Sequence, residues 1–276
     1  MLSVVVFILG LTVGSFLNCV IYRLKTGQNF LKGHSSCPHC LHQLKWYDLI
    51  PVLSFILLKG KCRYCKKPIS WQYPLVELIT GLLFLQIFNF QFSWTLSGGL
   101  SVGLLFNEFS IFNFLNLIYY WLIVSLLIVI FVYDLKWYVI PDKIVYPAII
   151  IALIFNFQFS IFNQFSIFKF SILSALGTSI FFLAIFLISR GKWLGFGDVK
   201  LAFFMGLFLG FPDILVALFL AFLIGAMIGL GLIIFKKKGL KSEIPFGPFL
   251  ITGTLIALFW GNQIINWYLN LITYNL

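Results

Sequence analysis

The stretch LNLIYYWLIVSLLIVIFVYD, residues 115–134, decides the class of fold to which this chain belongs. Its first 19 residues, 115–133, carry no charged side chain, and the apolar run ends at Asp134. A helix of about 20 apolar residues crosses the hydrocarbon core of a bilayer. The stretch therefore predicts a membrane-spanning helix with a carboxylate at one end.

The rest of the chain has the same apolar character. Of its 276 residues, 61% are hydrophobic and only 10% are charged, and its mean hydropathy is +1.04. A soluble domain is about 45–50% apolar and about 25% charged. We therefore predict an all-α protein that lies in the lipid bilayer and crosses it several times. The apolar start, Met1–Tyr22, lacks a basic beginning and a small-residue cleavage site, so we interpret it as a retained first span.

The hydrophobic runs predict about eight spans: 2–22, 74–90, 115–133, 144–159, 171–189, 199–211, 214–235 and 249–270. The net charge is +11, and most of the 19 Lys and Arg residues fall in short segments between these runs. Basic residues in short loops mark the cytoplasmic side. With eight spans, all of these segments, including Lys236–Lys241, lie on the cytoplasmic side. If 199–235 formed a single span, Lys236–Lys241 would lie on the opposite side from the other basic segments. No basic surface with interleaved aromatics remains, so we predict no nucleic-acid partner.

Between the first two spans lies a segment with two C-x-x-C pairs. The first pair is Cys37 and Cys40, and the second, after 21 residues, is Cys62 and Cys65. This spacing predicts a structural zinc site, because each pair supplies two sulfurs from one turn and four thiolates complete a tetrahedron. Disulfides are not expected in a cytoplasmic loop. With four cysteines present, the nearby histidines are interpreted as bystanders.

Two of the eight acidic residues are candidates for a catalytic pair. Asp134 ends one span, and Asp198 begins another directly after a Gly-Phe-Gly sequence. Taken alone, each has a simpler interpretation: Asp134 as a solvated end residue and Asp198 as a helix N-cap. Eight spans put both at the cytoplasmic face, and Gly195 and Gly197 leave room to position an extended substrate backbone. Two close carboxylates share a proton, so one can activate water while the other polarises a carbonyl.

The other acids have simpler interpretations, with one exception. Four of them fall in predicted loops and need no function: Asp48, Glu108, Asp213 and Glu243. Asp142 is interpreted as the N-cap of the fourth span. The exception is Glu77, which lies inside the second span, where a carboxylate is costly and usually functional. The alternative is that Glu77 neutralises a basic neighbour such as Arg23.

Other protease chemistries fit less well. All three histidines lie in the cysteine segment, away from any serine or cysteine of the later spans. The sequence contains neither an H-E-x-x-H zinc-protease motif nor a G-x-S-x-G elbow. A two-aspartate mechanism is therefore the hydrolytic chemistry that the sequence favours.

Six stretches of the chain together carry a family resemblance. They are Gly14–Asn18 with Tyr22-Arg23, the segment Cys37–Cys65 with Asp48–Ser54 inside it, Tyr73–Leu78, Asp134-Leu135 with Ile140–Asp142, Gly195–Leu201, and Ile244–Pro248. In this order they resemble the type IV prepilin leader peptidases, which are membrane aspartyl proteases of the GxGD class.

The resemblance implies a function, a location and a second activity. It implies cleavage of basic leaders from prepilins of the type IV pilus and pseudopilins of type II secretion, at the cytoplasmic face of the bacterial inner membrane. The catalytic roles fall on Asp134 and Asp198. Members with the cysteine segment usually also methylate the new N-terminus with S-adenosylmethionine. That second activity rests on the resemblance alone, because no G-x-G-x-x-G fingerprint is present. Its cofactor-binding residues are unknown, and Glu77 is the candidate because a carboxylate inside an apolar span is usually functional.

We therefore expect three parts. Residues 1–90, with the cysteine loop at 23–73, form the methyltransferase part, 91–114 a Phe-rich outer linker, and 115–276 the GxGD peptidase domain. Two alternatives stay open: a GxGD protease acting on other membrane helices, and a proton-coupled transporter. A transporter predicts acids near the middle of its spans, whereas Glu77 lies near one end.

Overall fold

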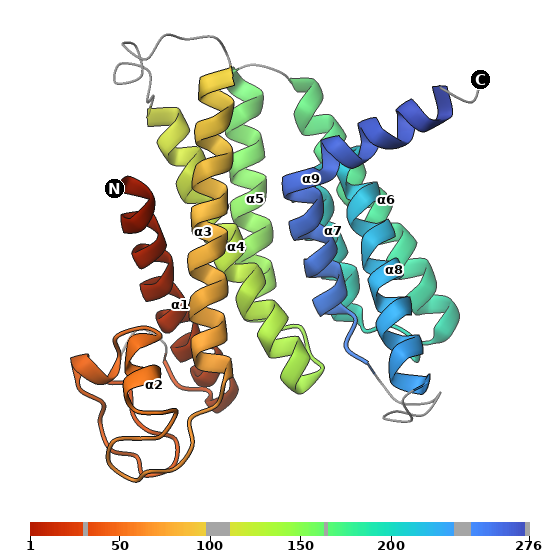
Figure 1. Cartoon of the computed structure of the whole chain (residues 1–276). Helices are drawn as coiled ribbons and strands as arrows, with labels where there is room; N and C mark the ends of the chain where they lie inside the picture. The colour runs from red at the N-terminus through yellow and green to blue at the C-terminus, as the bar shows by residue number, and fades with distance from the viewer. Residues whose placement is uncertain (30–32, 98–110, 163–164, 235–243, 274–276) are drawn as a thin grey trace. The chain divides into compact units, whose positions relative to one another are not determined.

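The computed structural model describes residues 1–29, 33–97, 111–162, 165–234 and 244–273 (Figure 1). In these ranges the chain is mostly helical outside the cysteine loop, and it contains no strand. The helices are α1 (Leu2–Thr26), α2 (Leu53–Leu57), α3 (Gln72–Ser97), α4 (Ile111–Trp137), α5 (Asp142–Phe162), α6 (Phe165–Ser189), α7 (Phe196–Leu209), α8 (Asp213–Ile234) and α9 (Gly247–Thr273), with the 3-10 turn η1 (Trp46–Asp48). The prediction of an all-α protein is confirmed.

Among the described residues, six helices are long and apolar enough to cross a membrane, namely α1, α3, α4, α6, α8 and α9. The other two predicted spans fall on α5 and α7. Helix α7 has only 14 residues, a length of about 21 Å, so it is shorter than the hydrocarbon core of about 30 Å. The prediction of a polytopic bundle holds, with α7 as the short member.

The chain forms two compact units, Met1–Val129 and Ile130–Leu276, and the division falls within α4. The predicted linker at 91–114 lies partly outside the described residues. Its described ends are helical, because α3 continues to Ser97 and α4 begins at Ile111. The basic run Lys236–Lys241, which supported the eight-span topology, also lies outside the described residues.

In the first unit, α1 packs closely along α3 because glycines let the two backbones approach. A Cβ on Gly10 would lie 2.7 Å from the Cα of Gly81. A Cβ on Gly14 would lie 2.7 Å from the Cα of Glu77. Two glycines four residues apart form the G-x-x-x-G pattern that is typical of close helix pairs in membranes.

In the second unit, α7 is a core helix. Leu201, Phe204 and Met205 are fully buried. Helix α6 approaches α7 where a Cβ on Gly206 would lie 2.5 Å from the Cα of Ala175. Figure 1 shows α6 beside α7 and α8 beside α9. Because neighbouring helices cover α7, it need not match the thickness of the bilayer, which explains its short length.

Candidate active site and metal centre

The cysteine segment folds as two knuckles that are built alike. In each, the N–H of the first cysteine donates to the carbonyl five residues later, and its own carbonyl accepts from the N–H four residues later, at 2.9–3.0 Å. Leu41 and Lys66 follow the second cysteines and have φ values of 58° and 59°. An isolated β-bridge closes each knuckle. Each C-x-x-C pair thus turns both sulfurs to one side.

The four sulfurs gather at one point. The Sγ atoms of Cys37, Cys40, Cys62 and Cys65 all lie within 4.8 Å of one another, and those of Cys37 and Cys65 are 3.9 Å apart. In a tetrahedral site each sulfur lies about 2.3 Å from the zinc ion, which places the sulfurs about 3.8 Å from one another. The cluster therefore fits a zinc ion, with cysteines alone as the ligands.

The surroundings of Cys37 favour the form that binds metal. Burial by itself raises the pKa of the Cys37 thiol, but hydrogen bonds from the backbone of Cys40 and His39 outweigh it and lower this pKa to about 7. Metal ligation requires the thiolate. Cys40 differs: a backbone hydrogen bond from His42 lowers its pKa, but burial and the neighbouring sulfurs of Cys37 and Cys65 outweigh it and raise this pKa to about 11. Cys37 is thus the member of the first knuckle whose surroundings favour the thiolate.

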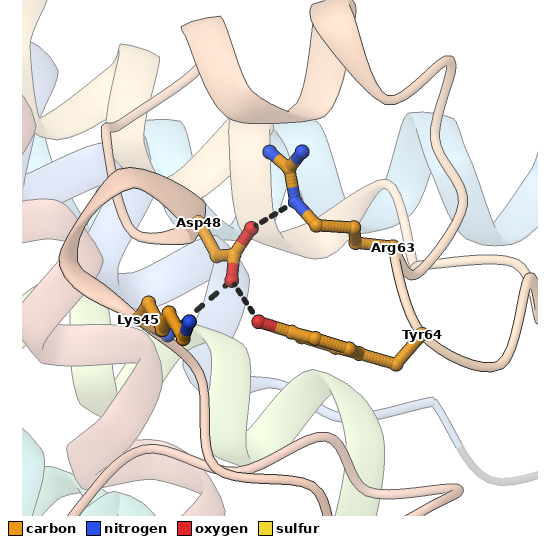
Figure 2. A network of polar contacts seen from close by, with 4 residues as sticks. All are labelled: Lys45, Asp48, Arg63 and Tyr64. Atoms are coloured by element: carbon orange, nitrogen blue, oxygen red, sulfur yellow. Dashed lines mark hydrogen bonds and ion pairs between the residues drawn. The ribbon is translucent and has the colours of Figure 1, made fainter.

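Asp48, which lies between the knuckles, is buried and fully engaged (Figure 2). Its side chain is 3% exposed, and its Oδ1 accepts from Arg63 Nε at 2.7 Å. Its Oδ2 accepts from the Tyr64 hydroxyl at 3.1 Å and from the Lys45 N–H at 3.3 Å. Burial raises the pKa of Asp48, but the bonds from Arg63, Lys45 and Tyr64 outweigh it and hold this pKa below its usual range. The sequence assigned Asp48 no function, whereas in the structure its side chain links η1 to the second knuckle through Arg63 and Tyr64.

Asp134 lies in the last turn of α4 and is only 4% exposed. Its Oδ2 accepts from the N–H of Gly247, the first residue of α9, at 3.1 Å. Gly247 has no room for a side chain, because a Cβ there would lie 2.5 Å from this oxygen. The interpretation of Asp134 as a solvated end residue is therefore wrong. Gly247 was part of a quoted motif, but nothing in the sequence linked it to Asp134.

Asp198 lies in the first turn of α7 and is 7% exposed. Its Oδ2 accepts from the N–H of Gly195, the residue before the helix, at 3.1 Å. The carboxylate thus caps α7 from the third helical position, and Gly195 is the N-cap. Its Oδ1 is buried and has no hydrogen-bond partner among the described residues. The Oδ2 of Asp198 is therefore held in place, and its Oδ1 can bond to a group from outside the described residues.

Ile140 packs against the glycines beside both aspartates. A Cβ on Gly197 would lie 2.9 Å from the Cβ of Ile140. A Cβ on Gly247 would lie 3.4 Å from the Cδ1 of Ile140. The charge on Asp134 also acts on the carboxyl group of Asp198. The structure therefore brings the two aspartates into one part of the second unit.

An ion pair that sequence reasoning missed lies beside Asp198. The Nζ of Lys200 is 2.7 Å from the Oδ1 of Asp142, and it lies 5.1 Å from the ring centroids of Tyr146 and Phe196. Asp142 was predicted to be an N-cap, but it is the first residue of α5 and pairs across to α7. The two residues are 58 positions apart in sequence, so no local pattern shows that they meet.

Glu77 is 7% exposed on α3, and its Oε2 accepts from the N–H of Val52 at 2.8 Å. The alternative that Glu77 neutralises a basic neighbour such as Arg23 stays a prediction. The guanidinium of Arg23 donates to the carbonyls of Asn29 and His34. One oxygen of the buried carboxylate, Oε2, is therefore bonded to the loop before α2.

Comparison with known proteins assigns the chain to a family. Residues 8–90 match the bacterial peptidase A24 N-terminal domain, and residues 121–230 match the type IV leader peptidase family. A protein of Legionella pneumophila named "Prepilin leader peptidase/N-methyltransferase" is 33% identical over 96% of this chain and 93% of its own length. The chain belongs to the type IV leader peptidase family.

Other relatives in this family bear the same name. One from Stutzerimonas stutzeri is 32% identical over 95% of this chain and 92% of its own length. One from Bacillus subtilis (strain 168) is 31% identical over 98% of this chain and 99% of its own length. No solved structure matches the chain significantly. The chain is thus a multi-pass membrane protein of a bacterial peptidase family.

The two family matches divide the candidate residues between them. The four cysteines and Glu77 fall within residues 8–90, which match the N-terminal domain. Asp134 and Asp198 fall within residues 121–230, which match the leader peptidase family. Gly247 lies beyond both matches, so its hydrogen bond to Asp134 comes from the structure alone.

Proposed function

We propose that this protein is an aspartyl peptidase that removes the basic leader from prepilins and pseudopilins and then methylates the new N-terminus. Its relatives carry both activities in their names over 92–99% of their own length. The observation that carries the peptidase assignment is the buried aspartate pair. Each carboxylate has one oxygen fixed by a glycine N–H at 3.1 Å.

The pair supplies both halves of the hydrolysis. Two carboxylates close together cannot both ionise cheaply, so the pair holds one proton. The charged member takes a proton from water, whose oxygen attacks the scissile carbonyl carbon, while the protonated member donates to the carbonyl oxygen. The proton taken from water then passes to the leaving nitrogen as the C–N bond breaks, and a hydroxyl of the diol returns a proton to the aspartate that donated one. The free Oδ1 of Asp198 is our candidate for the atom that contacts this water.

Gly195 and Gly197 have different parts in positioning the substrate. The space where Gly197 lacks a side chain is filled by Ile140. Gly197 therefore supports the packing of the site. A Cβ on Gly195 would lie 3.4 Å from the Oδ2 of Asp198 and 3.9 Å from the backbone nitrogen of Gly197, both ordinary contact distances. We assign the open backbone beside Asp198, where an extended substrate can lie, to Gly195.

We place the active site at the cytoplasmic face of the inner membrane. The cysteine loop and most other basic residues lie in short segments between spans, and such segments stay on the cytoplasmic side. A prepilin that inserts with its basic leader inside presents its scissile bond at the same face. Enzyme and substrate would then meet without moving charge across the bilayer.

We assign methylation to the N-terminal part, residues 1–90. A four-sulfur zinc site has no open position, so its role there is structural. S-adenosylmethionine, when bound, supplies a methyl group from a positively charged sulfonium. The acidic side chain of Glu77 and the buried Oε1 of Gln72, which has no partner among the described residues, suit a ligand with positive charge and hydrogen-bond donors. We propose that these residues hold it.

Co-expression with a candidate prepilin tests both activities in one measurement. The mass of the mature pilin should show loss of the leader and one added methyl group. A prepilin that stays uncleaved, while the purified enzyme cleaves other membrane helices, would point to a GxGD protease of different specificity. Mature but unmethylated pilin with S-adenosylmethionine present would reduce the proposal to a peptidase alone.

A further inference from the structure

The short helix α2 carries exposed apolar side chains that the zinc site does not use. Leu53, Ile56 and Leu57 are 50%, 62% and 71% exposed, although α2 lies in a loop between spans. Trp71, just before α3, is 70% exposed, and its ring centroid lies 4.9 Å from that of Phe55 on α2. Contiguous exposed apolar side chains of this kind mark a contact surface.

One hydrogen bond joins the start of α2 to the span on α3. Val52, the residue before α2, donates its N–H to the Oε2 of Glu77 at 2.8 Å. Glu77 is five residues beyond Gln72, where the span on α3 begins. At about 1.5 Å per residue, the Cα of Glu77 lies about 7.5 Å along this helix from Gln72, and Val52 is bonded to its side chain. Helices that lie in the membrane surface sit about 5–10 Å deep, at the boundary of headgroups and acyl chains.

The turn that leads into α2 is strained. Val52 has φ 59° and ψ −47°, a conformation that β-branched residues avoid. The N–H of Leu53 donates back to the carbonyl of Pro51, which makes Val52 the centre of a rare, strained γ-turn. Such strain persists only where the surroundings hold it. Here the buried carboxylate of Glu77 holds the N–H of Val52.

The charges around α2 suit a membrane surface. Lys59 and Lys61 follow the helix directly, are exposed, and form no ion pair with a described residue. Lysines close to the membrane surface are attracted to an anionic leaflet. Tryptophan is enriched where headgroups meet acyl chains, and Trp71 stands at the point where the chain enters α3. Apolar, aromatic and basic side chains together match lipid better than a protein surface.

We propose that α2 and Trp71 form an interfacial anchor, with acyl chains of the lipid covering Leu53, Ile56 and Leu57 and anionic headgroups binding Lys59 and Lys61. The hydrogen bond from Val52 to Glu77 sets the depth of this anchor. It holds the cysteine loop against the bilayer. If the proposed function is right, that is the face where the new pilin N-terminus emerges. The anchor itself is tested by lipid contact and needs no enzymatic readout.

Photo-crosslinking in the full-length, zinc-loaded protein tests the anchor. A benzophenone amino acid is placed at Leu57 or, as the control, at Gln43, an exposed polar residue of the same loop. The protein is reconstituted in vesicles of phosphatidylethanolamine and phosphatidylglycerol. Lipid adducts at position 57 and their absence at position 43 support the anchor. No lipid adduct at 57, or cross-links there to a second copy or to another part of the same chain, would overturn it.

Substitutions at Glu77 test whether its hydrogen bond to Val52 sets the depth of α2 in the membrane surface. In Glu77→Gln the side-chain carbonyl still accepts the N–H of Val52, so the lipid adduct at position 57 should persist. In Glu77→Ala the acceptor is lost, and the adduct should fall sharply. Adding Val52→Gly, which relieves the positive φ, should restore part of it. Equal lipid adduct in all of these variants would show that the hydrogen bond does not seat the helix.

Discussion

The cysteine centre and the aspartate site are built in opposite ways. All four sulfurs come from residues 37–65, and hydrogen bonds over four or five residues shape each knuckle. The aspartate site takes residues from α4, α7 and α9, and the bond between Asp134 and Gly247 joins positions 113 apart. The cysteine cluster, which fits a zinc ion, therefore depends on its own loop, whereas the aspartate site exists only when the second unit is packed.

This difference implies that the two centres fail independently. Metal binding supplies much of the folding free energy of a small loop with little apolar core. Helix packing supplies the order of the aspartate site, through glycines that allow close approach. Damage to one centre should leave the chemistry of the other largely intact, and the following changes test this from the largest expected effect to the smallest.

Asp134→Asn or Asp198→Asn should each lower leader removal by at least roughly a thousandfold, because an amide cannot carry the shared proton. Mass measurement of a co-expressed prepilin reports the cleavage. Asp213→Asn, which changes an acid of α8, serves as the control for membrane insertion. If either variant cleaved at a rate close to that of the wild type, the aspartate pair would not be the catalytic centre.

Gly247→Ala should lower the cleavage rate about 10- to 100-fold, because the new methyl group overlaps the Oδ2 of Asp134 and overpacking costs about 1–3 kcal/mol. Gly177→Ala is the matched control, since a Cβ at Gly177 meets nothing within 4 Å. Steady-state cleavage of a prepilin in detergent measures both variants. Equal activity in the two would mean that α9 does not hold Asp134 as described.

Zinc removal should damage the loop and spare the peptidase. Elemental analysis should find one zinc per chain, and Cys62→Ser should make residues 33–71 sensitive to protease and lower methylation. Leader removal should stay within a few-fold of wild type, because no cysteine lies in the second unit. Cys19→Ser, outside the cluster, should change neither property. A protease-resistant loop in zinc-free protein would contradict the structural role.

Glu77→Gln should lower methylation of the mature pilin several-fold while leaving leader removal largely intact. The amide keeps an acceptor for Val52 but loses the negative charge that suits a cationic methyl donor. The ratio of methylated to unmethylated mature pilin, read by mass, measures the effect. Equal loss of both activities would indicate that Glu77 only supports the structure.

The ion pair between Lys200 and Asp142 should have the smallest effect. The Asp142 side chain is 55% exposed, and pairs that reach solvent contribute about 0.2–1 kcal/mol. A double-mutant cycle with Lys200→Met and Asp142→Asn, followed by thermal unfolding in detergent, should give a coupling of this size. Lys143→Met is the control, because Lys143 is exposed beside Asp142 and pairs with no described carboxylate. A coupling well above this range would mean that the pair also orders the catalytic helix.

Features that arise from nearby residues could be predicted from the sequence. Apolar runs gave the all-α membrane class, because crossing a bilayer requires a length of uncharged helix that can be counted. The C-x-x-C pairs gave the four-cysteine cluster, because each knuckle closes within six residues. The positions of Asp134 and Asp198 at the ends of apolar runs suggested a pair at one membrane face.

Features that depend on packing between distant helices needed the tertiary structure. Three examples are the hydrogen bond from Gly247 to Asp134, the ion pair of Lys200 with Asp142, and the burial of α7. Each depends on segments that are tens of residues apart, so no local sequence pattern indicates it. Asp48 and Glu77 make the same point at shorter range. Their acidic character was visible in the sequence, but their partners depend on how the loop folds back on itself and on α3. Local chemistry determined which residues could act, and tertiary packing decided which of them meet.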